Sequence, residues 1–462
     1  MATQSPPIVS LQSPKDVSIG EIEAELRNIW HSYNADGDNG EFPGATRATT
    51  FTFVVYEPEE TQQLLAGLGF YKGPIDGIDG PLTESSVKAA QKAYGLTVTG
   101  KSDAQTLSRL RQEFAAARSQ AIATNGGDGN KQLADPNNRG FVVADAIAAA
   151  NPCRIIALCP MSGEDEGVTA QVSAYCPINK QSQNTLICCE YITLRGTAEA
   201  LERIGGIVEA LTISDLPKFL WWKATPDPNN GLFKRLSAVC TSIIVDSSSF
   251  NAPETDLLRV QNLLEQGIQI ADLNWRRLAA WQELTAEAFD PPERREAINE
   301  VDRVTIDYEK GNPAQAMMFL GWLASRLQWR PISYKQEGGD YDIKRIQFVA
   351  PDQRPIEAEL AGVPTADWGD IAGDMVGIRL TSTNMDADCC TVLCSETTGC
   401  MRMEAGGGAQ SCRIQQVTPL TDQKAEFLLS QQLRRWGREM LYEESLAVAA
   451  QILRLNEEPE QN

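Results

Sequence analysis

Short apolar runs and amphipathic stretches divide the chain into an earlier part of strands and helices and a later part rich in strands. In the earlier part, Phe219–Trp222 and Ser242–Val245 are predicted as buried strands, because each run is short, apolar and bounded by proline or polar residues. Between them, Leu232, Phe233 and Leu236 share one face of an amphipathic helix. Strand, helix and strand at this spacing predict a right-handed βαβ unit with parallel strands.

Lys223 and Asp246 directly follow these two strands. The carboxyl ends of parallel strands meet at one edge of the sheet, where open α/β sheets present their functional loops, so we expect both residues at that edge. Trp221 and Trp222 precede Lys223, and alternate side chains of a strand face opposite ways. For each tryptophan the core is the simpler interpretation, and a partner surface is the alternative.

A small helical module interrupts the strand pattern from residue 56 to residue 114. It contains a weak internal repeat with a shift of 23 residues, in which glycines provide a turn before a helix and Thr83 is expected as a helix N-cap. The stretch GPIDGIDGPLT resembles the peptidoglycan-binding-like three-helix module. Taken alone, this resemblance implies an alternative function, binding of peptidoglycan or another glycan through residues 56–114. A spacer or protein-interaction role is the competing interpretation, since a fold does not determine its function.

The later part of the chain begins with helical patterns. A long amphipathic helix is expected after Asp272, and Arg276 and Arg277 lie on it. Arginine pairs suit carboxylate or phosphate partners, so both are interface candidates, although a solvated helix face is the commoner explanation. From Tyr334 onward six strand-like runs predict an antiparallel β region, closed by a long helix that begins at Thr421.

These patterns predict an α/β N-terminal domain with an inserted small three-helix module, followed by a mixed α+β C-terminal domain. The expected boundaries place the N-terminal helix and strand of the α/β domain in residues 1–55, the module in 56–114 and a Gly- and Asn-rich linker in 115–140. The rest of the α/β domain then covers 141–250, and the helical and antiparallel β domain covers 251–462.

Charge and composition exclude several classes of function. The formal net charge of −21 disfavours nucleic-acid binding. With a single histidine, His31, and no nucleotide-binding or nucleophile motif, the sequence offers no catalytic constellation, cofactor site or metal site. An enzyme that uses Asp246 and the serines after it on a sugar phosphate remains a rival interpretation. No membrane-spanning run or signal peptide is visible, so a cytoplasmic location is expected.

Eleven cysteines form two groups. Six lie in or beside the strands of the α/β domain and are expected to be small buried hydrophobes: Cys153, Cys159, Cys176, Cys188, Cys189 and Cys240. The other five are Cys389, Cys390, Cys394, Cys400 and Cys412. Cys394 and Cys400 flank a five-residue hairpin loop that is expected to place them opposite each other, close enough for a reversible disulfide. Cys389, Cys390 or Cys412 are the alternative partners, and all five can remain thiols.

Several stretches carry a resemblance to a known family. DLPKFLWW, LFKRL and IIVDSS, followed by ADLNWRRLAAWQELTAEAFDPP and GNPAQAMMFLGWLASRLQW, resemble the OpcA family of glucose-6-phosphate dehydrogenase assembly proteins. The resemblance implies a non-catalytic protein that binds and activates that dehydrogenase. In photosynthetic members, thiol control fits the Cys394–Cys400 pair, with thioredoxin as the reductant and the oxidised protein as the activating form.

Overall fold

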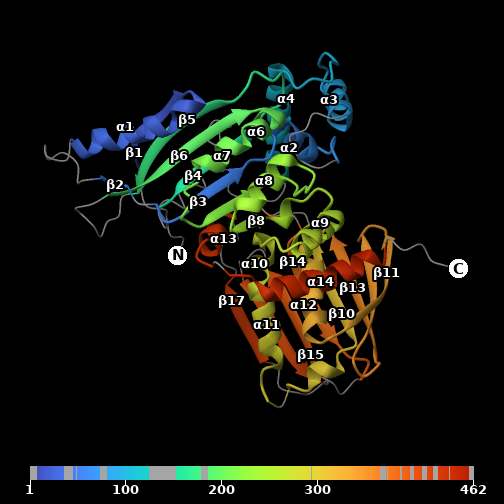
Figure 1. The fold of residues 1–462 in the computed structure, drawn as a ribbon. Helices are drawn as coiled ribbons and strands as arrows, with labels where there is room; N and C mark the ends of the chain where they lie inside the picture. Colours follow the sequence, from blue (N-terminus) through green and yellow to red (C-terminus); the bar gives the residue numbers. More distant parts are fainter. Residues whose placement is uncertain are drawn as a thin grey trace. The chain divides into compact units, whose positions relative to one another are not determined.

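The computed structural model describes residues 8–35, 45–47, 49–72, 81–123, 152–177, 186–292, 294–364, 371, 373–384, 388–395, 400–407, 414–419, 425–435 and 437–456. The chain forms two compact units (Figure 1). The first unit consists of Met1–Val245 with Ile268–Ile270 and Leu429–Trp436. The second unit consists of Asp246–Gly267, Ala271–Leu428 and Gly437–Asn462. Each unit is built around a mixed sheet, and the chain has the combination of helices and sheets expected from the sequence.

The sheet of the first unit has the strand order β1-β5-β6-β4-β3-β7-β8-β9 among the described residues, and β2 also pairs with β6. Its strands are β1 (Ile8–Val17), β2 (Ala45–Arg47), β3 (Thr52–Tyr56), β4 (Arg154–Pro160), β5 (Thr169–Pro177), β6 (Leu186–Gly196), β7 (Lys218–Trp222), β8 (Ser242–Val245) and β9 (Ile270–Asp272).

The centre of this sheet is a parallel, doubly wound arrangement. Starting at β3, the chain adds β4 and β6 on one side and then β7 and β8 on the other, and all of these neighbours are parallel. The predicted βαβ unit is confirmed, because β7 leads through α8 (Gly231–Val239) to β8. The strand order reverses between β3 and β7, and such a switch point is where open α/β sheets hold their ligands.

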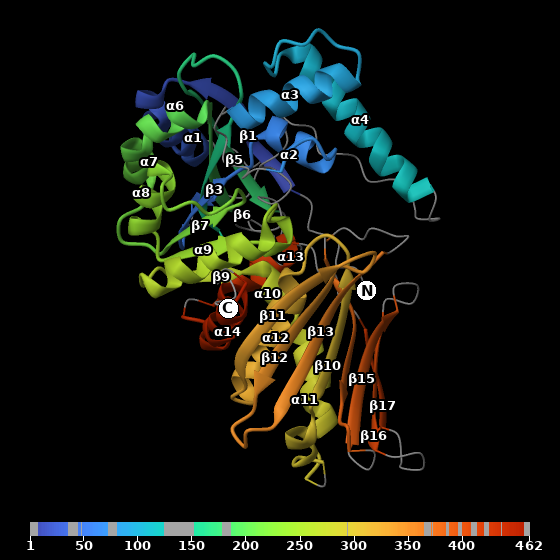
Figure 2. The same ribbon diagram turned by 90° about the vertical axis from the view of Figure 1, so that its right-hand side faces the viewer.

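Helices flank the first sheet. The helix α1 (Ile22–Ala35) contacts β5, and α8 contacts β7 (Figure 2). The helical segment after β6 is divided into α6 (Ala198–Arg203) and α7 (Gly205–Leu211), since Ile204 departs from helical geometry between them. The hydroxyl of Thr197 caps α6 by accepting a hydrogen bond from the amide of Ala200.

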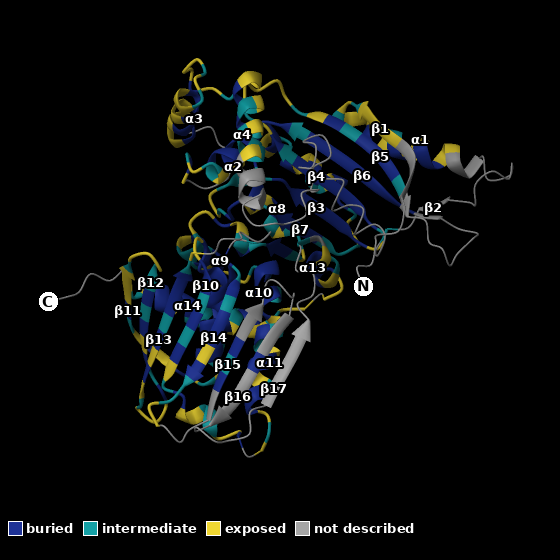
Figure 3. Cartoon of the chain, turned by 180° about the vertical axis from the view of Figure 1, so that it is seen from behind, coloured by how far each residue is buried: buried dark blue, intermediate teal, exposed yellow. Residues whose placement is uncertain are grey.

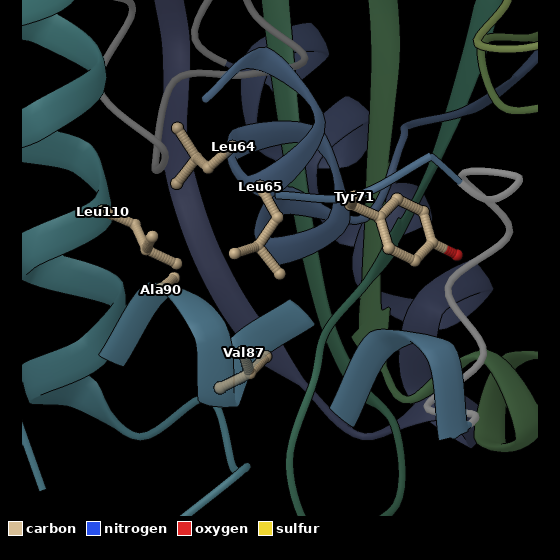
Figure 4. Close-up of a cluster of buried hydrophobic side chains, with 6 residues drawn as sticks. All are labelled: Leu64, Leu65, Tyr71, Val87, Ala90 and Leu110. Atoms are coloured by element: carbon tan, nitrogen blue, oxygen red, sulfur yellow. The ribbon is translucent and has the colours of Figure 1, made fainter. Parts of the chain in front are cut away.

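The module between β3 and β4 contains α2 (Glu60–Gly67), α3 (Pro81–Ala93) and α4 (Ala104–Ala123). Figure 4 shows the apolar cluster that these helices share, formed by Leu64, Leu65, Tyr71, Val87, Ala90 and Leu110. The prediction that Thr83 is a helix N-cap is wrong, because α3 already begins at Pro81. The buried hydroxyl of Thr83 instead accepts a hydrogen bond from the side chain of Gln62. The helix α4 extends into the predicted linker, and residues 124–151 lie outside the described part of the chain.

The sheet of the second unit has the order β11-β12-β13-β10-β14-β15-β16-β17 among the described residues. Its strands are β10 (Arg303–Glu309), β11 (Arg330–Gly338), β12 (Ile343–Val349), β13 (Pro355–Val363), β14 (Met375–Thr381), β15 (Asp388–Ser395), β16 (Cys400–Gly407) and β17 (Ile414–Pro419). The antiparallel region predicted from Tyr334 onward is confirmed, since the pairings of β11 with β12, β12 with β13 and β14 through β17 are antiparallel. The sequence pattern did not reveal β10, which lies between β13 and β14 and pairs in parallel with β13. Buried positions alternate with more exposed ones along β12 and the first half of β13 (Figure 3).

The helices of the second part of the chain are α9 (Pro253–Glu265), α10 (Leu273–Arg277), α11 (Ala279–Phe289), α12 (Ala314–Arg326), α13 (Ala425–Gln432) and α14 (Met440–Arg454). Two predictions of long helices are wrong. The helix after Asp272 is divided at Leu278 into α10 and α11, and the closing helix consists of α13 and α14. Within the second unit α12 packs on α14, α14 contacts α9 and β11, and α11 contacts β15 and β16.

The cysteine-containing hairpin has a different register from the expected one. The backbone pairs Cys394 with Met401, and it pairs Ser395 with Cys400. Ser395 therefore continues the strand, and the connection is one residue shorter than the predicted loop. The expected direct opposition of Cys394 and Cys400 is wrong, since the two residues are offset by one position. Cys389 pairs with Gly406, Cys390 pairs with Ala405, and Cys412 lies outside the described residues.

Candidate functional site

A buried polar cluster in the second unit brings together two of the residues that the sequence singled out. The guanidinium of Arg277 donates from Nη1 to Oδ1 of Asp246 at 2.7 Å and from Nη2 to Oδ2 at 2.9 Å. Asp246 also accepts hydrogen bonds from the amide and hydroxyl of Ser248. Burial alone would raise the pKa of Asp246, but the Arg277 guanidinium and the Ser248 hydrogen bonds hold that pKa below its usual value.

Asp272 and Asn274 form the next layer of the cluster. The Oδ1 atom of Asp272 accepts from the amides of Ser247 at 3.0 Å and Asn274 at 2.9 Å. The side-chain amide of Asn274 donates to the hydroxyl of Ser247. Burial, with the nearby carboxylate of Asp246 as the second cause, raises the pKa of Asp272 to about 6.

Two side chains at the start of α12 complete the cluster. Asn312 donates to the carbonyl oxygens of Ser247 at 2.9 Å and Ser248 at 3.0 Å. Gln315 donates to Oδ1 of Asn274 at 2.8 Å and to Oδ1 of Asp374 at 2.6 Å. The backbone around Gly373 passes so close to Asn312 that a Cβ atom at Gly373 would lie 1.9 Å from its carbonyl oxygen. Only glycine fits there, and its φ of +81° also favours glycine.

We name this group of side chains the polar cluster: Asp246, Ser247, Ser248, Asp272, Asn274, Arg277, Asn312 and Gln315. It joins three sequence segments that are far apart in the chain, VDSSS, ADLNWRR and GNPAQ. Hydrogen bonds link all of these side chains, although Oδ2 of Asp272 accepts none among the described residues, and the arrangement can fix the turn after β8, the start of α10 and the start of α12 in one geometry.

Arg276, the second arginine of the predicted pair, lies outside the polar cluster. It donates from Nη2 to Glu439 at 3.2 Å, and the indole of Trp275 donates to the other oxygen of the same carboxylate. The side chain of Arg276 is only 7% exposed. Arg276 therefore ties α10 to the start of α14 instead of presenting a free guanidinium.

Trp222 and Trp221 are both buried in the first unit, with exposed fractions of 1% and 2%. The ring of Trp222 stacks on Tyr56 at a centroid distance of 3.9 Å and meets Phe233 of α8 edge to face. Trp221 lies beside Phe53, and its indole nitrogen is buried without a hydrogen-bond acceptor in the structure. The structure therefore supports the core interpretation of both residues.

Lys223 lies at the switch point of the first sheet. Its Nζ atom is 2.6 Å from Oε2 of Glu57, the residue that follows β3, and 4.7 Å from the ring centre of Trp221. Lys223 and Asp246 follow neighbouring parallel strands as expected, but each has its own partner. Lys223 is held by Glu57, and Asp246 is held by Arg277.

The N-terminus of α2 is occupied by a carboxylate of the chain. In doubly wound sheets of this order, the helix after the central strand directs its N-terminal amides at the phosphates of a dinucleotide. Here the side chain of Glu59 accepts from the amide of Gln62 at 2.7 Å. Glu59 is 3% exposed, and burial raises its pKa. Together with Glu57 and Glu60 it lines a cavity of about 190 Å³. Arg111, which pairs with Glu60, and Arg195 line the same cavity.

A buried ion-pair network in the first unit escaped the sequence reasoning. Arg154 of β4 donates to Oε2 of Glu190 in β6 at 2.7 Å, and the indole of Trp30 in α1 donates to Oε1 of the same carboxylate at 2.7 Å. Arg154 also pairs with Glu23. The charged Glu190 inside the apolar run LICCEYITL was the available signal, because a charge is rarely fully buried unless it is paired.

The cysteines of the first unit differ from expectation. Cys188 is disulfide-bonded, so the interpretation of this residue as a small buried hydrophobe is wrong. Cys153 and Cys189 are buried thiols, and the amide of Cys153 donates to the sulfur of Cys189 at 3.4 Å. Burial raises the pKa of the Cys153 thiol, and the hydrogen bond from Cys153 lowers the pKa of the Cys189 thiol.

Beside the module lies a cavity of about 480 Å³, lined by Glu84, Thr99, Gly100, Lys101, Ser102, Asp103, Gly163 and Glu164. Gln91 holds two of these lining residues in place, because its Oε1 atom accepts from the amides of Thr99 and Gly100, both at 2.9 Å. In the part of the chain that the structure describes, no three His, Cys, Asp or Glu side chains are grouped as a metal site would require. No helix among the described residues is long and apolar enough to cross a membrane.

Comparisons with known proteins match nearly the whole chain. Residues 144–262 match the family described as "Glucose-6-phosphate dehydrogenase subunit N-terminal domain", and residues 268–446 match the corresponding "C-terminal domain". Residues 56–110 match a "Putative peptidoglycan binding domain". A Nostoc punctiforme protein named "Putative OxPP cycle protein OpcA" is 64% identical over 456 residues, which cover 98% of this chain and 97% of that protein. A Synechocystis protein of the same name is 58% identical over 455 residues, covering 98% and 95%.

Solved structures are more distant. The aldose-aldose oxidoreductase of Caulobacter crescentus is 15% identical with a TM-score of 0.35, over 57% of this chain and 82% of that chain, and this likeness carries no argument about function. The two domain matches and the relatives identify the chain. It belongs to the OpcA family, whose two domains are described as the N-terminal and C-terminal domains of a glucose-6-phosphate dehydrogenase subunit.

Proposed function

We propose that this protein binds glucose-6-phosphate dehydrogenase and acts in the oxidative pentose phosphate pathway as a non-catalytic assembly factor and allosteric activator. The observation that carries the proposal is the polar cluster. The segments that carry the family resemblance, VDSSS, ADLNWRR and GNPAQ, converge there on one another. Side chains that satisfy one another in the interior hold a surface in shape, which is what an assembly factor requires.

The switch point of the first sheet supports a non-catalytic role. A doubly wound sheet of this order would hold a dinucleotide at the start of α2, but Glu59 fills that position and Glu57 engages Lys223. The amide of Gln62, which would face such a phosphate group, already donates to a side chain of the same protein. Activation of the dehydrogenase would then arise because this protein binds the high-affinity conformation of the enzyme more tightly than the other conformation.

A redox-sensitive form of this activity is part of the proposal. Cys394 and Cys400 lie one register step apart at the end of the β15–β16 hairpin. A disulfide between them requires the strand ends to change register. Formation of the bond, and its reduction by thioredoxin, would therefore change the strand pairing in this hairpin. We propose that the oxidised protein is the activating form and that the protein works in the cytoplasm.

A steady-state assay of the dehydrogenase from the same source tests the proposal, with this protein added in its oxidised form or after reduction by thioredoxin. We expect a lower Michaelis constant for glucose 6-phosphate only with the oxidised protein. Equal activation by both forms would retain the partner and reject the redox switch. An unchanged Michaelis constant with both forms, together with no co-elution of the two proteins, would reject the function itself.

Single substitutions sharpen the assay. Cys394→Ser and Cys400→Ser should each remove the difference between the oxidised and reduced forms. Cys240→Ser is the matched control, because this thiol lies at the end of α8 in the first unit. If the response to oxidation survives both hairpin substitutions, Cys389, Cys390 and Cys412 become the residues to replace next.

A second candidate function is glycan binding through the module. The match of residues 56–110 to a peptidoglycan-binding domain and the cavity beside Gly100 favour it. Retention of the protein on purified peptidoglycan, compared with a Lys101→Ala variant in that cavity, tests this role. Equal recovery with and without peptidoglycan would remove it.

A further inference from the structure

One cysteine of the first unit is oxidised, and its position in the sheet is well defined. Cys188 takes part in a disulfide bond and is completely buried in β6. Its strand has neighbours on both sides. On one side, Arg47 of β2 lies opposite Cys188, so the second sulfur does not come from that strand position. The other neighbour is β5, which is antiparallel to β6.

The backbone register identifies the residue of β5 that lies opposite Cys188. Thr169 is paired with Arg195, and the register then runs without interruption to Tyr175 paired with Cys189. The observed pairing ends there, and extending it by one step, which stays within both strands, would place Cys176 opposite Cys188. The other edge of β5 agrees, because β1 continues its pairing past this point, with Val9 opposite Cys176.

We propose that Cys176 and Cys188 form a disulfide that ties β5 to β6. Directly opposed residues of an antiparallel pair have Cβ atoms about 4.5–5.5 Å apart, and a disulfide needs only a small further approach. Cys153 and Cys189, the nearest cysteines in sequence and register, are thiols that contact each other, so neither supplies the second sulfur.

This bond differs in kind from the switch proposed for the β15–β16 hairpin. Thiol–disulfide exchange requires a thiolate to reach a sulfur, and Cys188 has no exposed surface. Two equivalents of a thiol reductant would convert the bond into two cysteine thiols and one reductant disulfide, but only after β5 separates from β6. The Cys176–Cys188 bond is therefore a structural staple of the first unit that persists while the folded protein is exposed to thioredoxin.

Peptide mapping of the full-length protein tests the assignment. The folded protein, purified without reductant, is alkylated, unfolded and digested under non-reducing conditions with trypsin and a Glu-specific protease. Cleavage after Glu166 and Lys180 yields a peptide whose only cysteine is Cys176, and cleavage after Glu190 yields one with Cys188 and Cys189. A Cys189→Ser variant removes the remaining ambiguity in the second peptide.

We expect these two peptides to be linked. The link should survive a brief treatment of the folded protein with a dithiol and disappear when the same treatment is made in denaturant. Alkylated Cys176 and Cys188 without reductant, or a link from Cys188 to any other cysteine, would overturn the assignment. A bond lost from the folded protein as fast as from the unfolded one would overturn its role as a staple.

Thermal unfolding supplies an independent readout. Cys176→Ser and Cys188→Ser should each lower the Tm, on the order of 5 °C, and the double variant should lose no more than the larger single effect. Cys153→Ser is the control, because it removes a buried thiol without cutting a bond. Additive losses in the double variant would contradict a shared bond. Neither outcome depends on whether the protein activates the dehydrogenase.

Discussion

Two buried ion pairs of this protein join residues from distant positions in the chain. Asp246 and Arg277 are 31 residues apart, and Arg154 and Glu190 are 36 residues apart. Each pair has two hydrogen bonds or a further partner, which is what makes a buried charge tolerable. Asp272 is less well satisfied than these pairs, because its Oδ2 atom is buried without a hydrogen-bond donor among the residues that the structure describes.

We expect Asp272 to make stability depend on pH. Its pKa is about 6 in the folded protein and about 3.9 in the unfolded chain, so the folded state holds the proton more tightly. The free energy of unfolding therefore has its full contribution from this group below pH 4 and loses it as the pH rises to about 6 and beyond. The loss is on the order of 3 kcal/mol at pH 7.

Thermal unfolding between pH 4 and pH 8 measures this effect. Asp272→Asn keeps an oxygen for the amides of Ser247 and Asn274 and removes the charge, so its Tm should rise relative to the unmodified protein as the pH increases. Asp215→Asn, an exposed position, is the control and should show no such divergence. Parallel pH profiles of Asp272→Asn and the unmodified protein would contradict the prediction.

Substitutions of Trp221 and Trp222 distinguish a role in core packing from a role in contacting a partner protein. Trp222→Ala should lower the free energy of unfolding by about 3–5 kcal/mol, because it empties the space between Tyr56 and Phe233. Trp221→Phe should cost about 1 kcal/mol, since most of the ring volume remains and the unpaired indole N–H is removed. Denaturant unfolding provides both values. Weaker binding of the dehydrogenase by Trp221→Phe at unchanged stability would instead indicate a contact role.

At the scale of elements, helix and strand boundaries depend on neighbours. The helix after Asp272 ends at Leu278 although its apolar period continues, and the closing helix becomes α13 and α14. β10 pairs with β13 in parallel and with β14 in antiparallel orientation. Whether this segment becomes an interior strand depends on its pairing with two segments that come later in the chain. A local sequence pattern carries no information about that pairing.

The packing of α12 on α14 depends on a glycine. A Cβ atom at Gly321 would lie 2.3 Å from the carbonyl oxygen of Ser445 in α14. Gly321→Ala should therefore push the helices apart and lower the free energy of unfolding by about 1–3 kcal/mol. Gly206→Ala in α7 is the matched control, because nothing lies within 4 Å of the added atom there. The control should leave stability unchanged or raise it by up to about 1 kcal/mol.

Calorimetry of the two variants checks this prediction. Since one glycine lies in each unit, the separate variants also show which thermal transition belongs to which unit. Equal stability of Gly321→Ala and the unmodified protein would mean that the α12–α14 contact can relax without cost.

At the scale of the whole molecule, the net charge of −21 bears on association. An acidic protein is steered toward basic surfaces of a partner, and salt screens that attraction. If the dehydrogenase is the partner, its association rate constant with this protein should fall at least several-fold between about 0.02 M and 0.5 M salt, because the Debye length shrinks over that range. The dissociation rate constant should change much less.

Surface-based binding kinetics at several salt concentrations test this expectation. A neutral osmolyte at equal osmotic strength is the control for effects that are not electrostatic. An association rate constant that does not depend on salt would show that charge does not guide the encounter, and the acidic surface would then serve solubility alone.

The sequence by itself determined the local elements and their class. Short apolar runs between prolines and polar residues defined β7, α8 and β8, and the glycine-rich repeat revealed the module, because these features depend on residues close in sequence. Composition limited the chain to one histidine, His31, and so ruled out a multi-histidine metal site without any knowledge of contacts.

Only the tertiary structure decided which side chains meet. Asp246 forms an ion pair with Arg277, and Lys223 forms one with Glu57. Trp221 and Trp222 are both buried. Cys394 and Cys400 are offset by one position in the hairpin. Register and long-range pairing follow from how whole strands and helices pack, and a shift of one residue reverses the face of every side chain. Sequence patterns record which residues are apolar, but the partner of a buried charge is set by packing between segments tens of residues apart.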